Sequence, residues 1–252
     1  MDHTITEENG FKYVEEGEGD VLMLLHGLFG ALSNFFDIIE YFKATHKVVI
    51  PILPLYELPL DETTVTGYVN YVERFVAWKK YEHVIVLGNS LGGHIALIYA
   101  LQNPDKLKGV VLTGSSGLFE SAMGDSYPKR GDYDYIKKKA ELTFYDPKFA
   151  TKELVDELFE IVNDRNKVIR VLATAKSAIR QNLAEEVAKI QAPTLLIWGQ
   201  DDTITPPFVG EEFHKLLPNS KLILIDKCGH APMMEQPEEF NHYLKEFLEE
   251  IK

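Results

Sequence analysis

A serine with a glycine two residues away on each side stands between an apolar run and an apolar helical stretch. The segment Gly88-Asn89-Ser90-Leu91-Gly92 follows the run His83–Leu87 and opens the stretch Leu91–Leu101. In a strand-turn-helix of this kind the tight turn projects the serine hydroxyl from the end of the strand, with a helix N-terminus behind it. The context favours a nucleophilic Ser90 over an ordinary serine in a glycine turn.

A serine nucleophile needs a base, and the chain contains eight histidines. Most fall in the polar N-terminal stretch, on helix faces or at the ends of elements. His230 lies in the segment Lys227–Pro232, directly after the last apolar run, Lys221–Ile225. Loops at the carboxyl ends of parallel strands commonly carry catalytic groups, so we expect His230 to be the base.

The base in turn needs an acid that holds its tautomer and stabilises the imidazolium. Asp201 and Asp202 both follow the apolar run Thr194–Trp198. The loop pattern alone does not choose between the two carboxylates.

The loop His26–Gly30 ends an early apolar run and is expected to supply an oxyanion site. Such a site needs preorganised donors, and main-chain N–H groups provide them. We assign the pair to the N–H groups of Leu28 and Leu91. The residues beside these groups are expected to line the substrate pocket: His26, Gly27, Phe29, Asn89 and Ala231.

Short apolar runs alternate with amphipathic stretches along most of the chain. The expected strands are Phe11–Glu15, Val21–Leu25, Val48–Leu53, His83–Leu87, Gly109–Thr113, Thr194–Trp198 and Lys221–Ile225. Several are apolar on both faces, which is typical of a buried parallel sheet. Helical spacing marks Ser33–Lys43, Thr66–Lys80, Leu91–Leu101, Pro207–Leu217 and Pro237–Ile251. Strand-helix alternation predicts an α/β fold with a doubly wound, mostly parallel sheet.

About eighty residues between two of the strands lack a buried-strand pattern. They carry the helical patterns Tyr133–Thr143, Lys152–Asn163, Asn166–Ile179 and Leu183–Lys189. We therefore predict a helical insertion over 117–187, with the core formed by 1–116 and 188–252. The start of the insertion is rich in aromatic residues, which suit either internal packing or an apolar acyl or aryl pocket: Tyr127, Tyr133, Tyr135, Phe144 and Tyr145.

The composition narrows the classes of partner. A net charge of −13 argues against nucleic-acid binding and against attraction to anionic membranes. The apolar runs are too short to cross a membrane. A single cysteine and a polar, acidic N-terminal stretch without a signal-peptide pattern predict a cytoplasmic protein.

The sequence favours catalysis by side chains alone. It holds no His, Cys, Asp and Glu cluster at metal-ligand spacing and no phosphate or dinucleotide fingerprint, so we expect neither a metal nor a cofactor. Cys228 is two residues from His230, and a small buried thiol is the commoner role for such a residue. The expected partner is a small apolar ester, and the expected state is a monomer or homodimer.

Taken together, these motifs resemble the α/β-hydrolase superfamily over nearly the whole chain. Four of them occur in the family order: His26-Gly27, Gly88–Gly93, Trp198–Asp202, and Gly229-His230 continuing through Glu235, Pro237 and Phe240. The resemblance implies a Ser-Asp-His triad and places the acid three residues after the glycine of the Trp-Gly motif, which selects Asp202. It also implies that the insertion is a helical cap over the active site.

Finer features point to two groups within that superfamily. With Asn89 before the serine and Gly93 after it, the segment around Ser90 resembles that of the hydrolases that cleave carbon–carbon bonds in ring-fission products. Those enzymes also carry a cap arginine and a tryptophan after the histidine, whereas this chain has Leu158 at the expected arginine position and Ala231 after His230. Arg165, Arg170 and Arg180 are the possible substitutes.

These departures favour a serine carboxylesterase that forms an acyl-enzyme. The alternatives are carbon–carbon bond, thioester or lactone hydrolysis at the same site, and a non-catalytic ligand receptor on the same fold.

Overall fold

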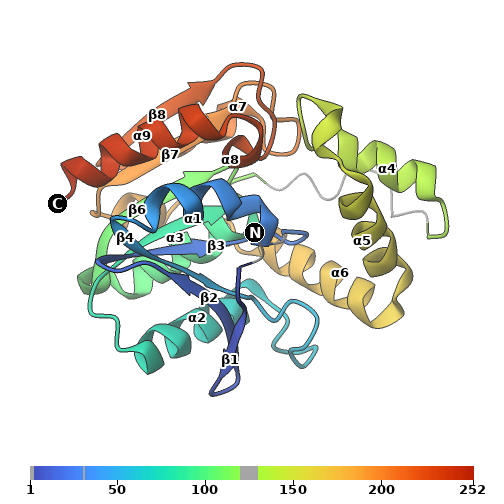
Figure 1. Ribbon diagram of the computed structural model, residues 1–252, viewed down its shortest axis with the longest axis horizontal. Coiled ribbons are helices and arrows are strands. Elements are labelled where there is room, and N and C mark those ends of the chain that lie inside the picture. The colour runs from blue at the N-terminus through green and yellow to red at the C-terminus, as the bar shows by residue number, and fades with distance from the viewer. Residues whose placement is uncertain (1–2, 31, 120–129) are drawn as a thin grey trace.

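The apolar runs form the strands of one twisted sheet. The computed structural model describes residues 3–30, 32–119 and 130–252, and within them eight strands lie in the order β1-β2-β4-β3-β5-β6-β7-β8 (Figure 1). They are β1 (Thr6–Glu8), β2 (Phe11–Glu16), β3 (Asp20–Leu25), β4 (His46–Pro51), β5 (Val84–Asn89), β6 (Leu107–Thr113), β7 (Thr194–Gly199) and β8 (Ser220–Ile225). β2 pairs antiparallel with both β1 and β4, and all other neighbouring pairs are parallel. The predicted α/β class with a mostly parallel sheet is confirmed.

Helices cover both faces of this sheet. One face packs against α1 (Phe36–Phe42) and α9 (Pro237–Glu250), and the other against α2 (Val65–Lys79), α3 (Leu91–Gln102) and α7 (Pro207–Leu216). Short helical turns complete the core: η1 (Leu32–Phe35), η2 (Pro104–Lys106), η4 (Val187–Lys189) and α8 (Pro232–Glu235). Among the described residues, no helix is both long enough and apolar enough to pass through a membrane.

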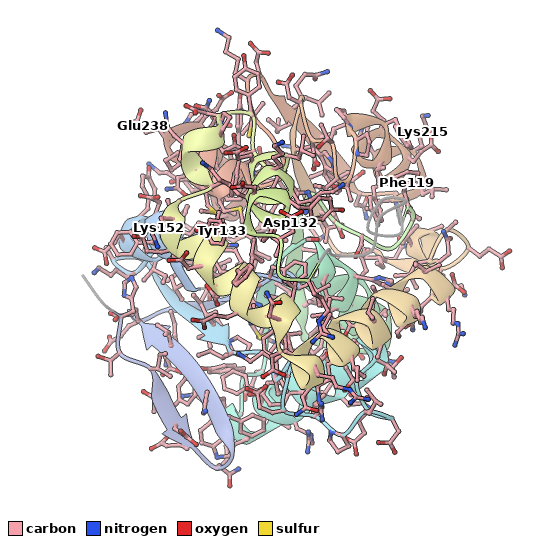
Figure 2. All side chains as sticks on the ribbon, turned by 90° about the vertical axis from the view of Figure 1, so that its right-hand side faces the viewer. Phe119, Asp132, Tyr133, Lys152, Lys215 and Glu238 are labelled. Carbon is pink, nitrogen blue, oxygen red and sulfur yellow. The ribbon has the colours of Figure 1, made fainter. Side chains whose placement is uncertain are left out.

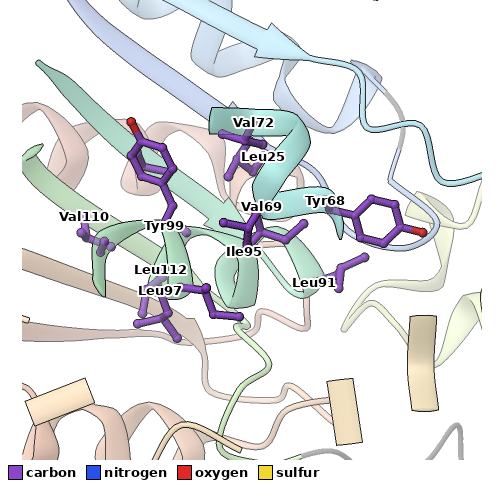
Figure 3. Packing of buried hydrophobic residues seen from close by; sticks show 14 of the residues in the cluster. Leu25, Tyr68, Val69, Val72, Leu91, Ile95, Leu97, Tyr99, Val110 and Leu112 are labelled. Atoms are coloured by element: carbon purple, nitrogen blue, oxygen red, sulfur yellow. The ribbon is translucent and has the colours of Figure 1, made fainter. Parts of the chain in front are cut away.

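Alternate side chains of the central strands enter two separate apolar layers. In β3, Leu22 and Leu24 face the layer under α1 and α9, while Met23 and Leu25 face the layer under α2 and α3. Figure 3 shows the second layer, where Ile95 of α3 lies beside Val69 of α2. This two-sided burial explains why the central strands are apolar on both faces.

The helical insertion between β6 and β7 contains α4 (Tyr133–Glu141), η3 (Pro147–Phe149), α5 (Lys152–Asn163) and α6 (Arg165–Arg180). Figure 1 shows these helices together at one side of the molecule. The insertion is tied to the core through α2, because the Tyr68 hydroxyl and Thr174 Oγ1 are 2.8 Å apart and Val65 N donates to Ser177 Oγ at 3.1 Å. A helical insert is therefore present, while the boundaries 117 and 187 stay predictions.

Some elements differ from the expectation. The prediction of a helix over Leu183–Lys189 is wrong, because only η4, Val187–Lys189, is helical. Leu183 N donates to the distant Gly117 carbonyl, and most of the following backbone bonds span three residues, as in a 3₁₀ turn. The polar edge strand β1 and the four-residue helix α8 were not expected, because neither carries an apolar period. The expected helix Ser33–Lys43 is divided into η1 and α1.

We predict that Gly92→Ala destabilises the fold far more than Gly10→Ala. A Cβ at Gly92 would lie 1.9 Å from the backbone oxygen of Leu25, so α3 would have to move away from the sheet. Gly10 has a positive φ but open space around it. We expect a loss of at least about 3 kcal/mol in the free energy of unfolding for Gly92→Ala, against about 1 kcal/mol for Gly10→Ala, measured by urea unfolding. Equal losses would contradict this account.

Candidate active site

Ser90 occupies a strained turn between β5 and α3. Its φ of 55° and ψ of −118° lie in a region that L-residues seldom adopt, and such strain costs of order 1–3 kcal/mol. Hydrogen bonds hold the turn: Ser90 N donates to the Thr113 oxygen at 3.1 Å, and the Ser90 oxygen accepts from Gly93 N at 3.0 Å. The flanking glycine Gly88 is required by contact, since its Cβ would lie 2.3 Å from the Gly92 oxygen.

His230 and Asp202 form a buried hydrogen-bonded pair. His230 Nδ1 lies 2.9 Å from Asp202 Oδ2, and the two residues are 7% and 3% exposed. Because an ionised carboxylate accepts hydrogen bonds, Nδ1 carries the proton in this arrangement and Nε2 is the basic nitrogen. Asp201, by contrast, is exposed. Geometry therefore places Asp202 rather than Asp201 against the histidine.

The Asp202 carboxylate is fixed by its own loop. Oδ1 accepts from the N–H groups of Ile204 at 2.8 Å and Thr205 at 2.9 Å, and Oδ2 accepts from Thr205 Oγ1 at 2.9 Å. The loop thus presents one oriented carboxylate oxygen to His230.

Ser90 and His230 open into one cavity of about 580 Å³, which lies within the range of small-molecule sites. Its lining is largely apolar and, besides Ser90 and His230, comes from two sources. The core loops contribute Gly27, Leu28, Phe29, Gly30, Asn34, Asn89, Thr203, Ile204, Ala231 and Met234, and the insertion contributes Tyr135, Ile136, Lys139, Ala140, Leu142, Thr143, Phe144, Leu154, Leu158 and Val162.

The two main-chain donors proposed for the oxyanion belong to the loop after β3 and to the start of α3. Leu28 lines the cavity, and its loop is held by the turn bond from Gly30 N to the Gly27 oxygen at 3.1 Å. Leu91 is the first residue of α3, where N–H groups have no partner inside the helix. A Cβ at Gly27 would lie 3.2 Å from the Ser90 Cβ, so the loop passes close to the serine.

The expected pocket residues divide into two groups. Gly27, Phe29, Asn89 and Ala231 line the cavity, whereas His26 is not among the lining residues and the structure corrects its placement. The His26 Nδ1 lies 2.9 Å from the Gly27 oxygen, and its Nε2 accepts from Leu53 N at 3.0 Å. Burial lowers the pKa of the imidazole, and these contacts are those of a neutral ring. His26 joins the Gly27 loop to the chain after β4.

Asn89 is also a connecting residue. Its Nδ2 donates to the Thr113 oxygen at 3.1 Å and to the His230 oxygen at 3.2 Å. One buried amide therefore links the serine turn, the end of β6 and the histidine loop.

Sequence reasoning missed most of the cavity wall formed by the insertion. Ile136 and Ala140 of α4 and Leu154 and Val162 of α5 lie on the inner faces of amphipathic helices, and that apolar period was their only signal. Leu158, expected at the position of an arginine, lines the cavity. The arginines considered as substitutes, Arg165, Arg170 and Arg180, are absent from the described lining.

The aromatic residues of the insertion have different roles. Tyr135 and Phe144 line the cavity. Tyr133 packs within the insertion, where its hydroxyl donates to Asp156 at 2.7 Å, and Figure 2 shows it beside Asp132 and Lys152 on the face of the insertion. Tyr145 is exposed, and Tyr127 lies outside the described residues. Two of the five therefore suit an apolar pocket.

Within the described part of the chain, no group of three or more His, Cys, Asp or Glu side chains is arranged to hold a metal ion.

A family model for the alpha/beta hydrolase fold matches residues 20–237. The chain belongs to the α/β-hydrolase family. Among solved structures, this α/β hydrolase is similar to MGS-MChE2, an alpha/beta hydrolase enzyme from the metagenome of sediments of the Mar Chica lagoon, Morocco. The two are 46% identical with a TM-score of 0.82, and the match covers 98% of each chain.

Curated relatives of this α/β hydrolase include enzymes of different chemistry. It is 26% identical to the 2-hydroxy-6-oxo-6-phenylhexa-2,4-dienoate hydrolase of Comamonas testosteroni, over 94% of this chain and 90% of the relative. It is also 26% identical to Lipase 1 of Psychrobacter immobilis, over 97% of this chain and 82% of the relative. A meta-cleavage product hydrolase, CumD, shares the fold with a TM-score of 0.86 at 20% identity over 98% of each chain.

We predict that the two adjacent aspartates of this α/β hydrolase differ sharply in their effect on Ser90. Asp202→Asn removes the acceptor of His230 Nδ1 and should slow labelling of Ser90 by a fluorophosphonate roughly 10⁴-fold. Asp201→Asn makes the same change of charge at an exposed position, and in this variant Ser90 should be labelled at close to the wild-type rate. The measurement is the labelling rate by intact-protein mass spectrometry, with Ser90→Ala as the unlabelled control. A larger effect of Asp201→Asn would identify the other carboxylate as the acid.

Proposed function

We propose that this α/β hydrolase is a serine carboxylesterase that cleaves small esters with an apolar acyl group. The observation that carries the proposal is the buried His230–Asp202 pair, whose histidine lines one largely apolar cavity together with Ser90. The lipase among the relatives also supports ester cleavage.

In the first half of the reaction, His230 Nε2 takes the proton of the Ser90 hydroxyl while Ser90 Oγ bonds to the ester carbonyl carbon. Asp202 stabilises the imidazolium through Nδ1, and the N–H groups of Leu28 and Leu91 hold the negative charge on the former carbonyl oxygen. The carbon–oxygen bond to the alcohol then breaks, and His230 returns its proton to the leaving alkoxide. The product of this half is an acyl-enzyme on Ser90.

In the second half, water attacks the acyl carbon and gives a proton to His230 Nε2. The bond to Ser90 Oγ breaks, His230 protonates the serine, and the carboxylic acid leaves. The reaction involves no oxidation or reduction, and it consumes one water molecule per ester.

We predict turnover of p-nitrophenyl esters that depends on Ser90 and rises with acyl length. Burial of each additional CH₂ contributes about 0.8 kcal/mol, so kcat/KM should increase roughly tenfold from acetate to butyrate and further to octanoate. Ser90→Ala should abolish turnover without changing the fold. Release of p-nitrophenolate measures the rates.

The outcomes separate the rival functions. Turnover that persists in Ser90→Ala would overturn the nucleophile assignment, and a preference for acetate would exclude the apolar cavity as the acyl site. Labelling of wild type by a fluorophosphonate with no ester turnover would favour a different substrate or a receptor. Ligand binding to a receptor would raise thermal stability without turnover.

Carbon–carbon bond hydrolysis is the second candidate, because one relative is named as a dienoate hydrolase and the chain carries Asn89 and Gly93 beside Ser90. Against it stands the described cavity lining, where Leu158 occupies the expected arginine position and Lys139 is the cationic side chain. An arginine binds a carboxylate in a bidentate geometry that a lysine does not reproduce.

We therefore predict that 2-hydroxy-6-oxo-6-phenylhexa-2,4-dienoate is a poor substrate, with a kcat/KM well below that of p-nitrophenyl octanoate. Loss of the dienoate absorbance over time measures this rate. A kcat/KM for the dienoate above that of the octanoate ester would replace esterase by carbon–carbon hydrolase as the function.

A further inference from the structure

A short irregular segment of the insertion forms a part of the cavity wall that is bonded to His230. Leu142, Thr143 and Phe144 line the cavity, and the chain between α4 and η3 has neither helix nor strand structure at these positions. Turn bonds tie the first three of these residues to the end of α4, for example from Thr143 N to the Ala140 oxygen at 3.1 Å. The next two N–H groups, those of Tyr145 and Asp146, find their acceptor in another part of the molecule. We call 142–146 the wall segment.

The wall segment is joined to the histidine loop through Glu235, at the end of α8. The carboxylate Oε2 accepts from Tyr145 N at 2.7 Å and from Asp146 N at 3.3 Å, and the other oxygen, Oε1, accepts from Gly229 N at 2.8 Å. The adjacent residue of the loop adds a direct bond, from His230 N to the Thr143 oxygen at 2.8 Å. One carboxylate thus holds the insertion on one side and the neighbour of the base on the other.

The packing around this carboxylate leaves little room. Glu235 is 7% exposed, and a Cβ at Gly229 would lie 2.7 Å from the Thr143 oxygen and 2.8 Å from Tyr145 N. Burial raises the pKa of Glu235, while the backbone N–H groups act in the opposite direction. Burying a carboxyl group is costly, so a residue of this kind suggests a geometric task beyond filling space.

We propose that Glu235 is a positioning residue that holds the wall segment against the histidine loop and thereby sets which acyl chains fit the cavity. The first part stands on the contacts of Glu235 alone. The second part, on acyl chains, rests on the proposed ester hydrolysis.

The first test is amide hydrogen exchange in Glu235→Gln. Glutamine has the same size, but its NH₂ group faces backbone donors, so at least one of the three bonds is lost. The amides of Tyr145, Asp146 and Gly229 should exchange at least tenfold faster, while β7 exchanges as in wild type. The control Glu238→Gln makes the same charge change at an exposed position of α9, visible in Figure 2, and should leave all these rates unaltered.

The reactivity of Cys228 is a second measure of whether the wall segment separates from the histidine loop. It is the only cysteine of the chain, it is fully buried, and its Sγ lies 3.8 Å from the Gly229 oxygen. A maleimide should therefore react with Cys228 at least tenfold faster in Glu235→Gln than in wild type or Glu238→Gln. Glu235→Asp keeps the charge but has a shorter side chain, so the wall segment should separate from the histidine loop in this variant too. It replaces Glu235→Gln in the test if the glutamine variant does not fold.

The third measurement is acyl selectivity, taken as the ratio of kcat/KM for p-nitrophenyl octanoate to that for the acetate. This ratio should change at least fivefold in Glu235→Gln and stay constant in Glu238→Gln. A purely structural role would lower the amount of active enzyme and leave the ratio unaltered.

The results distinguish failure of this proposal from failure of the proposed function. Unchanged exchange and Cys228 reactivity in a folded Glu235→Gln, or equal acceleration in β7, would show that Glu235 does not hold the wall segment locally. Local opening with an unchanged ratio would overturn the selectivity role. Local opening in a protein whose wild type cleaves no ester would support the positioning role and refute the esterase proposal.

Discussion

The contact between α3 and β3 governs the geometry of the whole site. Gly92 lies so close to the Leu25 oxygen that any side chain would force the helix away from the sheet. This close approach lets the chain turn sharply at Ser90 and hold a positive φ there. The Ser90 oxygen then accepts from Gly93 N and Ser116 N, so the segment after β6 is placed by the same turn. Strain at one residue is maintained by contacts that surround it on several sides.

Two buried carboxylates flank the histidine loop and hold it in different ways. Asp202 contacts the imidazole and is oriented by its own loop. Glu235 instead accepts from main-chain N–H groups, that of Gly229 directly before His230 and that of Tyr145 in the insertion. The cost of burying each carboxylate is offset by several hydrogen bonds, which also fix its direction. One acid thereby holds the side chain of His230, and the other holds the backbone of the preceding residue, Gly229.

The core and the insertion contribute different parts of the site. The core supplies the serine turn and the histidine–aspartate pair, whereas much of the cavity wall comes from α4, α5 and the segment between them. The cavity-lining side chains of the insertion take no part in the hydrogen bonds of the serine turn or of the His230–Asp202 pair. Substrate choice can therefore change while the core geometry is kept, in agreement with a fold that hosts many activities.

By itself, the sequence determined the local elements: the strand-turn-helix around Ser90, the loops after β7 and β8, and the helical nature of the insertion. These follow from glycine positions, from short apolar runs and from apolar spacing with a period of 3.6 residues, all of which are local features of the chain. The choice of Asp202 over Asp201 came from the family resemblance, and the structure shows the physical basis, since only Asp202 is buried against His230.

Only the tertiary structure decided the contacts between distant segments. His26 binds Leu53 N instead of lining the cavity, Leu183 binds the Gly117 oxygen instead of starting a helix, and Glu235 binds Tyr145 N, 90 residues away. Each is a single hydrogen bond between residues far apart in sequence, and it leaves no period or spacing in the chain. The cavity wall has the same origin, because its shape depends on how the insertion packs onto the core.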